Sequence, residues 1–385
     1  MITPLKRLIP FNKPYMSGKE LEYMVRAYIG GQLSGNGQFT RHCQEILTKK
    51  LGAKGVLLTH SCTAAMEMAA ILFNATFGDE IIMPSFTFVS TANAFVLRGA
   101  TPVFIDIRAD TLNINESLIE GAITEKTKAI AVVHYAGVPC EMDEICRIAN
   151  KHGLLLLEDA AQGIQASYKG RPLGSIGQLG AISFHETKNI ISGEGGALVI
   201  NDSSYLTRAE IVWEKGTNRV NFNKGEVAKY TWLDIGSSYL PSEITSAFLL
   251  AQLESAETLT ARRLTSWYFY HDKLEKYEEK QLLRRPIIPP HYSPNGHIYY
   301  IILPSHQERD ELLKLLLENN ILAVFHYIPL HSSPAGLHFG RTATDMSITD
   351  DMSNRLIRLP LWNDIDEDIM NKVIQVIEHY FNTKK

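Results

Sequence analysis

The residues best placed for chemistry follow two apolar runs near the middle of the chain. Leu154–Leu157 is a run of leucines that predicts a strand buried on both faces, and it leads directly to the acids Glu158 and Asp159. A second run, Ala181–Phe184, leads to Lys188. Because ligands bind beyond the carboxyl ends of strands in open α/β sheets, we expect a carboxylate and a lysine amine at neighbouring strand ends.

A carboxylate and a lysine in this arrangement suit one cofactor in particular. Lysine amines form Schiff bases with carbonyl groups, and pyridoxal phosphate combines such a bond with an acid that faces its pyridine nitrogen. In this interpretation Asp159 keeps the ring nitrogen protonated, and Gln162, one turn further on, reaches the ring hydroxyl. Spacing alone leaves open the alternative that both charges are solvated surface residues.

A turn that carries hydroxyl groups follows an earlier apolar run, residues 56–59. Ser61, Cys62 and Thr63 stand between the run 56–59 and a helix-forming stretch. A strand, such a turn and a helix start together are typical of phosphate binding, although capping of the helix by Ser61 or Thr63 explains them as well. No partner base marks Cys62 as a nucleophile.

Two groups of aromatic and imidazole side chains allow more than one interpretation. Phe88, after the second apolar run, either belongs to the core or stacks against a cofactor ring. His326, Tyr327 and His331 lie in a proline-bounded segment that serves either loop packing or sugar binding. No carboxylate or cysteine joins the two histidines, so we expect no metal site.

Seven short apolar runs alternate with helix-length stretches and must position these residues. They predict a mainly parallel seven-stranded sheet covered on both sides, with the closely spaced last pair antiparallel. The runs are 56–59, 80–83, 102–107, 129–134, 154–158, 181–184 and 197–200.

The segments around this sheet complete a fold of the α/β class. We assign 1–50 to an N-terminal arm with helices, 51–240 to the large domain and 241–385 to a smaller C-terminal α/β domain. Within the last segment we expect a long helix over 242–280, on which Arg262 and Arg263 are solvated.

Composition excludes several classes of function. The chain has 385 residues, of which 45% are hydrophobic, and 38 basic residues nearly balance 42 acidic ones, which favours neither nucleic-acid nor membrane binding. No segment has the length of a signal peptide core or a membrane span. The four cysteines have no zinc-like spacing, so we expect reduced thiols and a cytoplasmic location.

Five motifs resemble, in order and spacing, the nucleotide-sugar aminotransferases, the DegT-like branch of fold-type I pyridoxal phosphate enzymes. The motifs are SCTAAMEMAA, PSFTFVSTANAF, EDAAQ, SFHETKN and SGEGGA. The resemblance implies that Lys188 forms the Schiff base, Asp159 faces the ring nitrogen, Gln162 neighbours the ring hydroxyl and Phe88 stacks on the ring. It also assigns the cofactor phosphate to Ser61, Cys62, Thr63 and Ser183.

Four further segments resemble the members of this family that aminate dTDP-4-keto-6-deoxyglucose. They are HETKN, EKGTNR, YTWLDIGSSYLPSEI and FHYIPLHSSPAG. The resemblance implies L-glutamate as the amino donor, a homodimer in which Ser238 reaches the partner subunit's phosphate, and sugar contacts from Arg219, His326, Tyr327 and His331. Where Ser238 and Leu240 stand, much of the wider family carries asparagine and arginine. Another keto-sugar nucleotide, another carbon position or a non-catalytic scaffold remain as alternatives.

Overall fold

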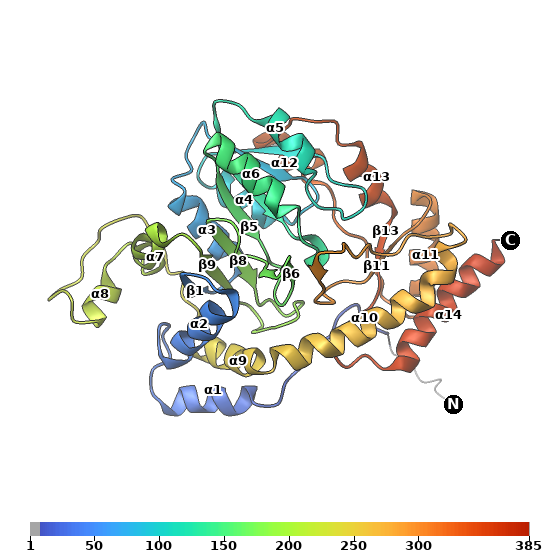
Figure 1. Ribbon diagram of the computed structural model, residues 1–385. Helices are drawn as coiled ribbons and strands as arrows, with labels where there is room; N and C mark the ends of the chain where they lie inside the picture. The colour runs from blue at the N-terminus through green and yellow to red at the C-terminus, as the bar shows by residue number, and fades with distance from the viewer. Residues whose placement is uncertain (1–7, 385) are drawn as a thin grey trace.

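The computed structural model describes residues 8–384, so residues 1–7 of the expected N-terminal arm lie outside the described part. An eight-stranded sheet forms its centre (Figure 1). In spatial order the strands are β1 (Gly55–Thr59), β9 (Gly196–Ile200), β8 (Leu179–Ser183), β5 (Leu155–Asp159), β4 (Thr127–Val133), β2 (Glu80–Pro84), β3 (Thr101–Ile105) and β12 (Arg341–Thr342).

All seven apolar runs form strands of this sheet. Strand β9 is antiparallel to both β8 and β1, as expected for the closely spaced pair, and the other predicted strands pair in parallel. The eighth strand, β12, comes from the C-terminal third and lies parallel to β3. It has only two residues, which are too few to show an apolar period.

Helices cover both faces of the sheet because successive apolar side chains along each strand point to opposite faces. Leu58 and Leu156 face one layer, whereas their neighbours Leu57 and Leu157 face the other. The first layer consists of α1 (Glu20–Ile29), α2 (Gln38–Leu51), α5 (Ile119–Ala122), α6 (Met142–His152) and α9 (Glu243–Glu254). The second consists of α3 (Cys62–Leu72), α4 (Val89–Val96) and α7 (Leu206–Trp213).

A separate hydrophobic core lies in the C-terminal part. It is built from α10 (Ala256–Glu278), β11 (Tyr300–Ile302), α11 (His306–Glu318), β13 (Leu356–Arg358) and α14 (Glu367–Thr383). The single helix expected over 242–280 is wrong in one respect, because α9 and α10 are separated at Ser255. The division of the chain at residues 50 and 240 remains a proposal.

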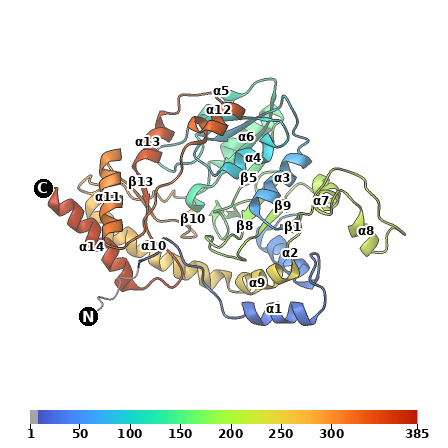
Figure 2. The same cartoon turned by 180° about the vertical axis from the view of Figure 1, so that it is seen from behind.

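The remaining elements are short. They are α8 (Arg219–Asn223), α12 (Pro334–Phe339), α13 (Ser347–Arg355), β6 (Ser167–Tyr168), β7 (Arg171–Pro172) and β10 (Tyr292–Ser293), with 3-10 turns at Glu116–Leu118, Tyr135–Gly137, Ser203–Tyr205 and Leu330–Ser332. The segment around α8 projects away from the rest of the molecule in both views (Figures 1 and 2). Across residues 8–384, none of the helices has the length and apolarity needed to span a bilayer.

Candidate active site

A cavity of about 910 Å³ opens at the carboxyl ends of β5 and β8, and segments from both ends of the chain complete its wall. Its size is in the range of ligand sites, roughly 300–1,000 Å³. Most of the residues singled out from the sequence line it. They are Ser61, Cys62, Thr63, Phe88, Asp159, Gln162, Ser183, Lys188, His326 and Tyr327.

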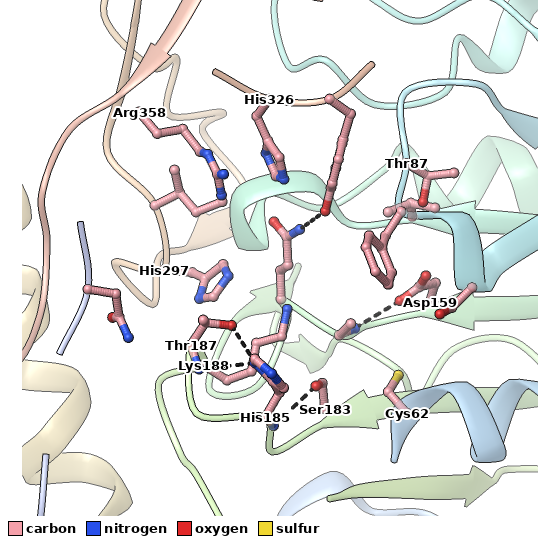
Figure 3. Close-up of a pocket in the computed structure, with 18 of the residues that line it drawn as sticks. Cys62, Thr87, Asp159, Ser183, His185, Thr187, Lys188, His297, His326 and Arg358 are labelled. Atoms are coloured by element: carbon pink, nitrogen blue, oxygen red, sulfur yellow. Dashed lines mark hydrogen bonds between the residues drawn. The ribbon is translucent and has the colours of Figure 1, made fainter. Parts of the chain in front are cut away.

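Asp159 and Lys188 both face this cavity (Figure 3). The carboxylate of Asp159 is buried and held on both oxygens, since Oδ2 accepts a 2.7 Å hydrogen bond from the hydroxyl of Thr91 and Oδ1 accepts one of 3.1 Å from the backbone N–H of Ala161. Burial lowers the pKa of Lys188, against the raising effect of the charge on Asp159. The lysine amine is therefore closer to its neutral, nucleophilic form than an exposed lysine is.

The hydroxyl-bearing turn begins helix α3 at the edge of the cavity. The hydroxyl of Ser61 caps the helix by accepting a 3.1 Å hydrogen bond from the N–H of Ala64, and the hydroxyl of Thr63 lies 2.7 Å from that of Ser90. Burial raises the pKa of Cys62, which keeps its thiol protonated. The helix dipole and free N–H groups of this turn suit an anion, so capping and phosphate binding are compatible.

The side chains around the centre of the cavity form an ordered polar and aromatic wall. Gln162 accepts a 2.7 Å hydrogen bond from the N–H of Ala136 and donates one of 3.0 Å to the hydroxyl of Tyr327. Phe88 lines the cavity with 57% of its surface exposed, so it is not a core residue. His326 shares a 2.9 Å hydrogen bond with the hydroxyl of Tyr135.

Three of the predicted site residues lie outside the cavity wall of the single chain. His331 lies behind it, where Nδ1 is 2.8 Å from the hydroxyl of Ser85. Arg219 is the first residue of the projecting helix α8, and Ser238 is exposed at the end of the same projecting segment.

Sequence reasoning missed four side chains at or beside the cavity: Thr91, Arg263, His297 and Arg358. The prediction that Arg263 is solvated is wrong. Its side chain is buried and donates to the carbonyl oxygens of Gly296, His297 and Leu361. A faint signal existed for Thr91 only, because Thr87 and Thr91 are one helical turn apart beside a strand end.

A mainly parallel sheet covered on both faces, with a buried carboxylate and a lysine of lowered pKa lining one cavity, is typical of a pyridoxal-phosphate type of transferase. Residues 14–378 match the DegT/DnrJ/EryC1/StrS aminotransferase family. The chain therefore belongs to this family and is an aminotransferase that works with pyridoxal 5′-phosphate, as the motifs implied.

Known proteins resemble the chain over nearly its whole length. An uncharacterized protein of Methanocaldococcus jannaschii, MJ1066, is 33% identical over 89% of this chain and 90% of its own. The spore coat polysaccharide biosynthesis protein SpsC of Bacillus subtilis is 30% identical over 98% of both chains. Among solved structures, one similar chain is Helicobacter pylori PseC, an aminotransferase involved in the biosynthesis of pseudoaminic acid. It has a TM-score of 0.89 at 25% identity, and the match covers 98% of this chain and 100% of the PseC chain.

Proposed function

We propose that the chain transfers the amino group of L-glutamate to the keto carbon of a nucleotide-linked sugar and releases 2-oxoglutarate. The observation that carries this proposal is that Lys188 and Asp159 line one cavity at whose edge helix α3 begins. Pyridoxal phosphate has an aldehyde, a ring nitrogen and a phosphate. An amine, a carboxylate and a helix N-terminus in one cavity suit these three groups respectively.

The roles of the side chains follow from this assignment. Pyridoxal phosphate, when bound, carries the amino group and takes up the electrons of the bond that breaks at the substrate carbon. Nζ of Lys188 would take the proton from the donor carbon and deliver it to the former aldehyde carbon of the cofactor, because its lowered pKa lets it act as a base. Asp159 would keep a proton on the ring nitrogen, Gln162 would contact the ring hydroxyl and Phe88 would hold the face of the ring. Ser61, Cys62, Thr63 and Ser183 hold the phosphate.

For the acceptor we propose dTDP-4-keto-6-deoxy-D-glucose, which would become dTDP-4-amino-4,6-dideoxy-D-galactose for surface polysaccharide synthesis of the enterobacterial common antigen type. The four segments quoted from the sequence support this choice. The names of SpsC and PseC support a role in polysaccharide or sugar synthesis more generally. His326, Tyr327, His331 and Arg219 are the proposed sugar contacts.

We further propose a homodimer in which the segment 214–238 of one subunit reaches the active site of the other. This segment projects from the chain (Figure 1), and several of its large apolar side chains are exposed. In such an arrangement Ser238 and Arg219 act at the partner subunit's site, which accounts for their distance from the cavity of their own chain. A cytoplasmic location stays a prediction.

The test is an assay of the purified holoenzyme with L-glutamate and a panel of keto-sugar nucleotides that differ in base, carbon position and stereochemistry. We expect turnover with the dTDP-4-keto-6-deoxy sugar and, by NMR, an axial amino group at C4 as in galactose. Selective turnover of a 3-keto sugar or of a UDP sugar would show that the acceptor is a different keto-sugar nucleotide. An enzyme with bound cofactor should be yellow, and borohydride should remove this colour. A colourless protein that borohydride does not change would be a scaffold and not an enzyme.

A further inference from the structure

One imidazole of the cavity wall has no part in the proposed amino transfer. His297, which precedes β11, is buried and lines the cavity. Its Nδ1 lies 2.8 Å from Oδ1 of Asn189, the residue that follows Lys188 in the chain. Among residues 8–384, Nε2 of the same ring has no hydrogen-bond partner. A nitrogen that a buried ring leaves without a partner is available to a group in the cavity.

The hydrogen bonds of Asn189 determine which nitrogen of His297 carries the proton. Nδ2 of Asn189 donates a 2.6 Å hydrogen bond to the carbonyl oxygen of Asn295, and a carbonyl oxygen can only accept. Oδ1 of Asn189 therefore faces His297 as an acceptor, so Nδ1 of His297 must carry a proton. Burial and the nearby positive charges lower the pKa of His297 well below its ordinary value, which keeps the ring neutral. Nε2 is then an acceptor with a free lone pair.

Further hydrogen bonds hold the imidazole in one place. The N–H of His297 donates a 3.1 Å hydrogen bond to Oδ1 of Asn295, and its carbonyl oxygen accepts one of 2.8 Å from Nη2 of Arg263. Nδ2 of Asn295 donates in turn to the carbonyl oxygens of Gln162 (2.8 Å) and Ile164 (2.9 Å). The acceptor is therefore fixed relative to the segment that carries Gln162.

Lys188 is the donor in the cavity that suits this lone pair. The charge on Lys188 lowers the pKa of His297, and Figure 3 shows both side chains in the same part of the cavity. Arg263 and Arg358, the arginines nearby, donate to backbone carbonyl oxygens. Because Asn189 follows Lys188 directly, one short stretch of backbone both carries the lysine and anchors the imidazole.

We propose that His297 is a positioning residue for Lys188, a proposal that rests on the proposed transaminase function. Nζ of Lys188, when it is free of the cofactor, donates a hydrogen bond to Nε2 of His297. This bond holds the amine in place during both half-reactions. When Nζ takes the proton from the donor carbon, the neutral imidazole stabilises the ammonium that forms, until Nζ delivers that proton to the cofactor. His297 keeps its own proton on Nδ1 throughout.

Nitrogen NMR of the cofactor-free protein with labelled histidine tests this contact without turnover. We expect the wild type to show His297 as a neutral ring protonated at Nδ1, identified by the signals that His297→Gln lacks. The Nε2 signal should move in Lys188→Ala, because its hydrogen-bond donor is gone. A proton on Nε2, or an Nε2 signal that is the same in wild type and Lys188→Ala, would overturn the proposal.

Both half-reactions of the holoenzyme should slow together, because Lys188 acts in each. His297→Phe keeps a ring without an acceptor, and we expect it to slow the reactions with L-glutamate and with the keto-sugar nucleotide about 10- to 100-fold, the range for a hydrogen bond to a charged group. His297→Gln, whose amide oxygen can accept, should recover most of both rates. Slowing of only one half-reaction would assign His297 to that substrate and overturn its role at Lys188.

The titration of Lys188 separates positioning from a purely structural role. The measurement is the pH midpoint of adduct formation between the cofactor-free protein and added pyridoxal phosphate. Loss of the acceptor disfavours the ammonium, so His297→Phe should lower this midpoint by about one pH unit. A loosened cavity wall would instead admit water and raise the midpoint towards 10.5, which would contradict the proposal. The other charged or titratable groups that face the pair stay the same in these variants; they are Cys62, Asp159, Arg263, His326 and Arg358.

His271 provides the matched control. Its imidazole is half-buried and stacks on the ring of Trp267, with 4.8 Å between the ring centroids, and it does not line the cavity. His271→Phe should keep the wild-type midpoint and both wild-type rates. A wild-type holoenzyme that aminates none of the keto-sugar nucleotides would overturn the proposed function, whereas the NMR result decides the contact between His297 and Lys188 by itself.

Discussion

The hydroxyl of Thr91 donates a 2.7 Å hydrogen bond to Oδ2 of Asp159. Because this hydroxyl uses its proton on the carboxylate, it must accept from the hydroxyl of Thr87, which lies 2.8 Å away and also faces the cavity. Both threonines are buried, Thr87 just before α4 and Thr91 in its first turn. They hold the carboxylate in one orientation, with its charge available to a ring nitrogen.

Replacement of Thr91 by valine removes this hydrogen bond and keeps the shape of the side chain. A hydrogen bond to a charged group contributes roughly 1.5–3 kcal/mol, so we expect kcat to fall about 10- to 100-fold. Thr91→Ser keeps the hydroxyl and should restore most of the rate. Steady-state kinetics and the absorbance spectrum of the bound cofactor check both variants, and a wild-type kcat and spectrum for Thr91→Val would contradict a positioning role.

The strand ends of the parallel sheet could be predicted from sequence because each functional group there follows directly on an apolar run. Asp159 is the last residue of β5, and Ser183 is the last residue of β8. Once a run is recognised as a parallel strand, topology places its end at the ligand-binding edge. The cavity therefore contains the lysine and carboxylate that the local patterns singled out.

The opposite wall of the cavity could not be predicted in this way. Arg358 belongs to a strand of three residues, and Arg263 lies in a helix where most charges are solvated. Their places depend on how the C-terminal part packs on the sheet, and no local period records that packing. Phe11 likewise lines the cavity although it belongs to the N-terminal arm. It is held there by a hydrogen bond from the N–H of Leu361 to the carbonyl oxygen of Phe11.

The lowered pKa of Lys188 leads to a prediction about pH. Burial favours the neutral amine, so in the cofactor-free protein the rate of adduct formation with added pyridoxal phosphate should rise with pH around a midpoint below 10.5, the ordinary value for lysine. Asp159→Asn removes a negative charge that raises this pKa and should shift the midpoint to still lower pH. Absorbance after borohydride reduction measures the adduct, with Lys188→Ala as the blank. A midpoint at or above 10.5 would contradict the burial of the amine.

Glu158, the neighbour of Asp159, ties the end of β5 to the loop that precedes β8. Its fully buried carboxylate accepts hydrogen bonds from the N–H groups of Gly174 (2.9 Å), Ile176 (2.6 Å) and Gly177 (2.6 Å) and from Nε2 of His134 (2.9 Å). Burial raises the pKa of Glu158, but the hydrogen bonds from His134 and the glycines outweigh it, so its pKa lies below the ordinary value.

We expect Glu158→Gln to lower the free energy of unfolding by about 3–5 kcal/mol, because an amide NH₂ would face two of these donors. The carboxylate contributes stability above the unfolded-state pKa, and that contribution is lost as pH falls through the lower folded-state pKa, so the difference between wild type and variant should shrink in acid. Urea unfolding at pH 7 and pH 3 measures it. Glu144→Gln, at an exposed position, is the control, and equal stability of Glu158→Gln and wild type at pH 7 would refute the anchor.

The projecting segment makes the proposed homodimer testable. Phe222, Tyr230, Trp232, Leu233 and Ile235 are between 40% and 79% exposed in the single chain, which is unusual for large apolar side chains clustered on one segment. If the partner subunit covers these side chains, Trp232→Glu should shift sedimentation from dimer toward monomer. Activity should fall in proportion, because Ser238 and Arg219 would leave the partner's site. Leu317→Glu, at an exposed position of α11, is the matched control. Wild-type sedimentation for Trp232→Glu, or a fully active wild-type monomer, would exclude this segment as the contact.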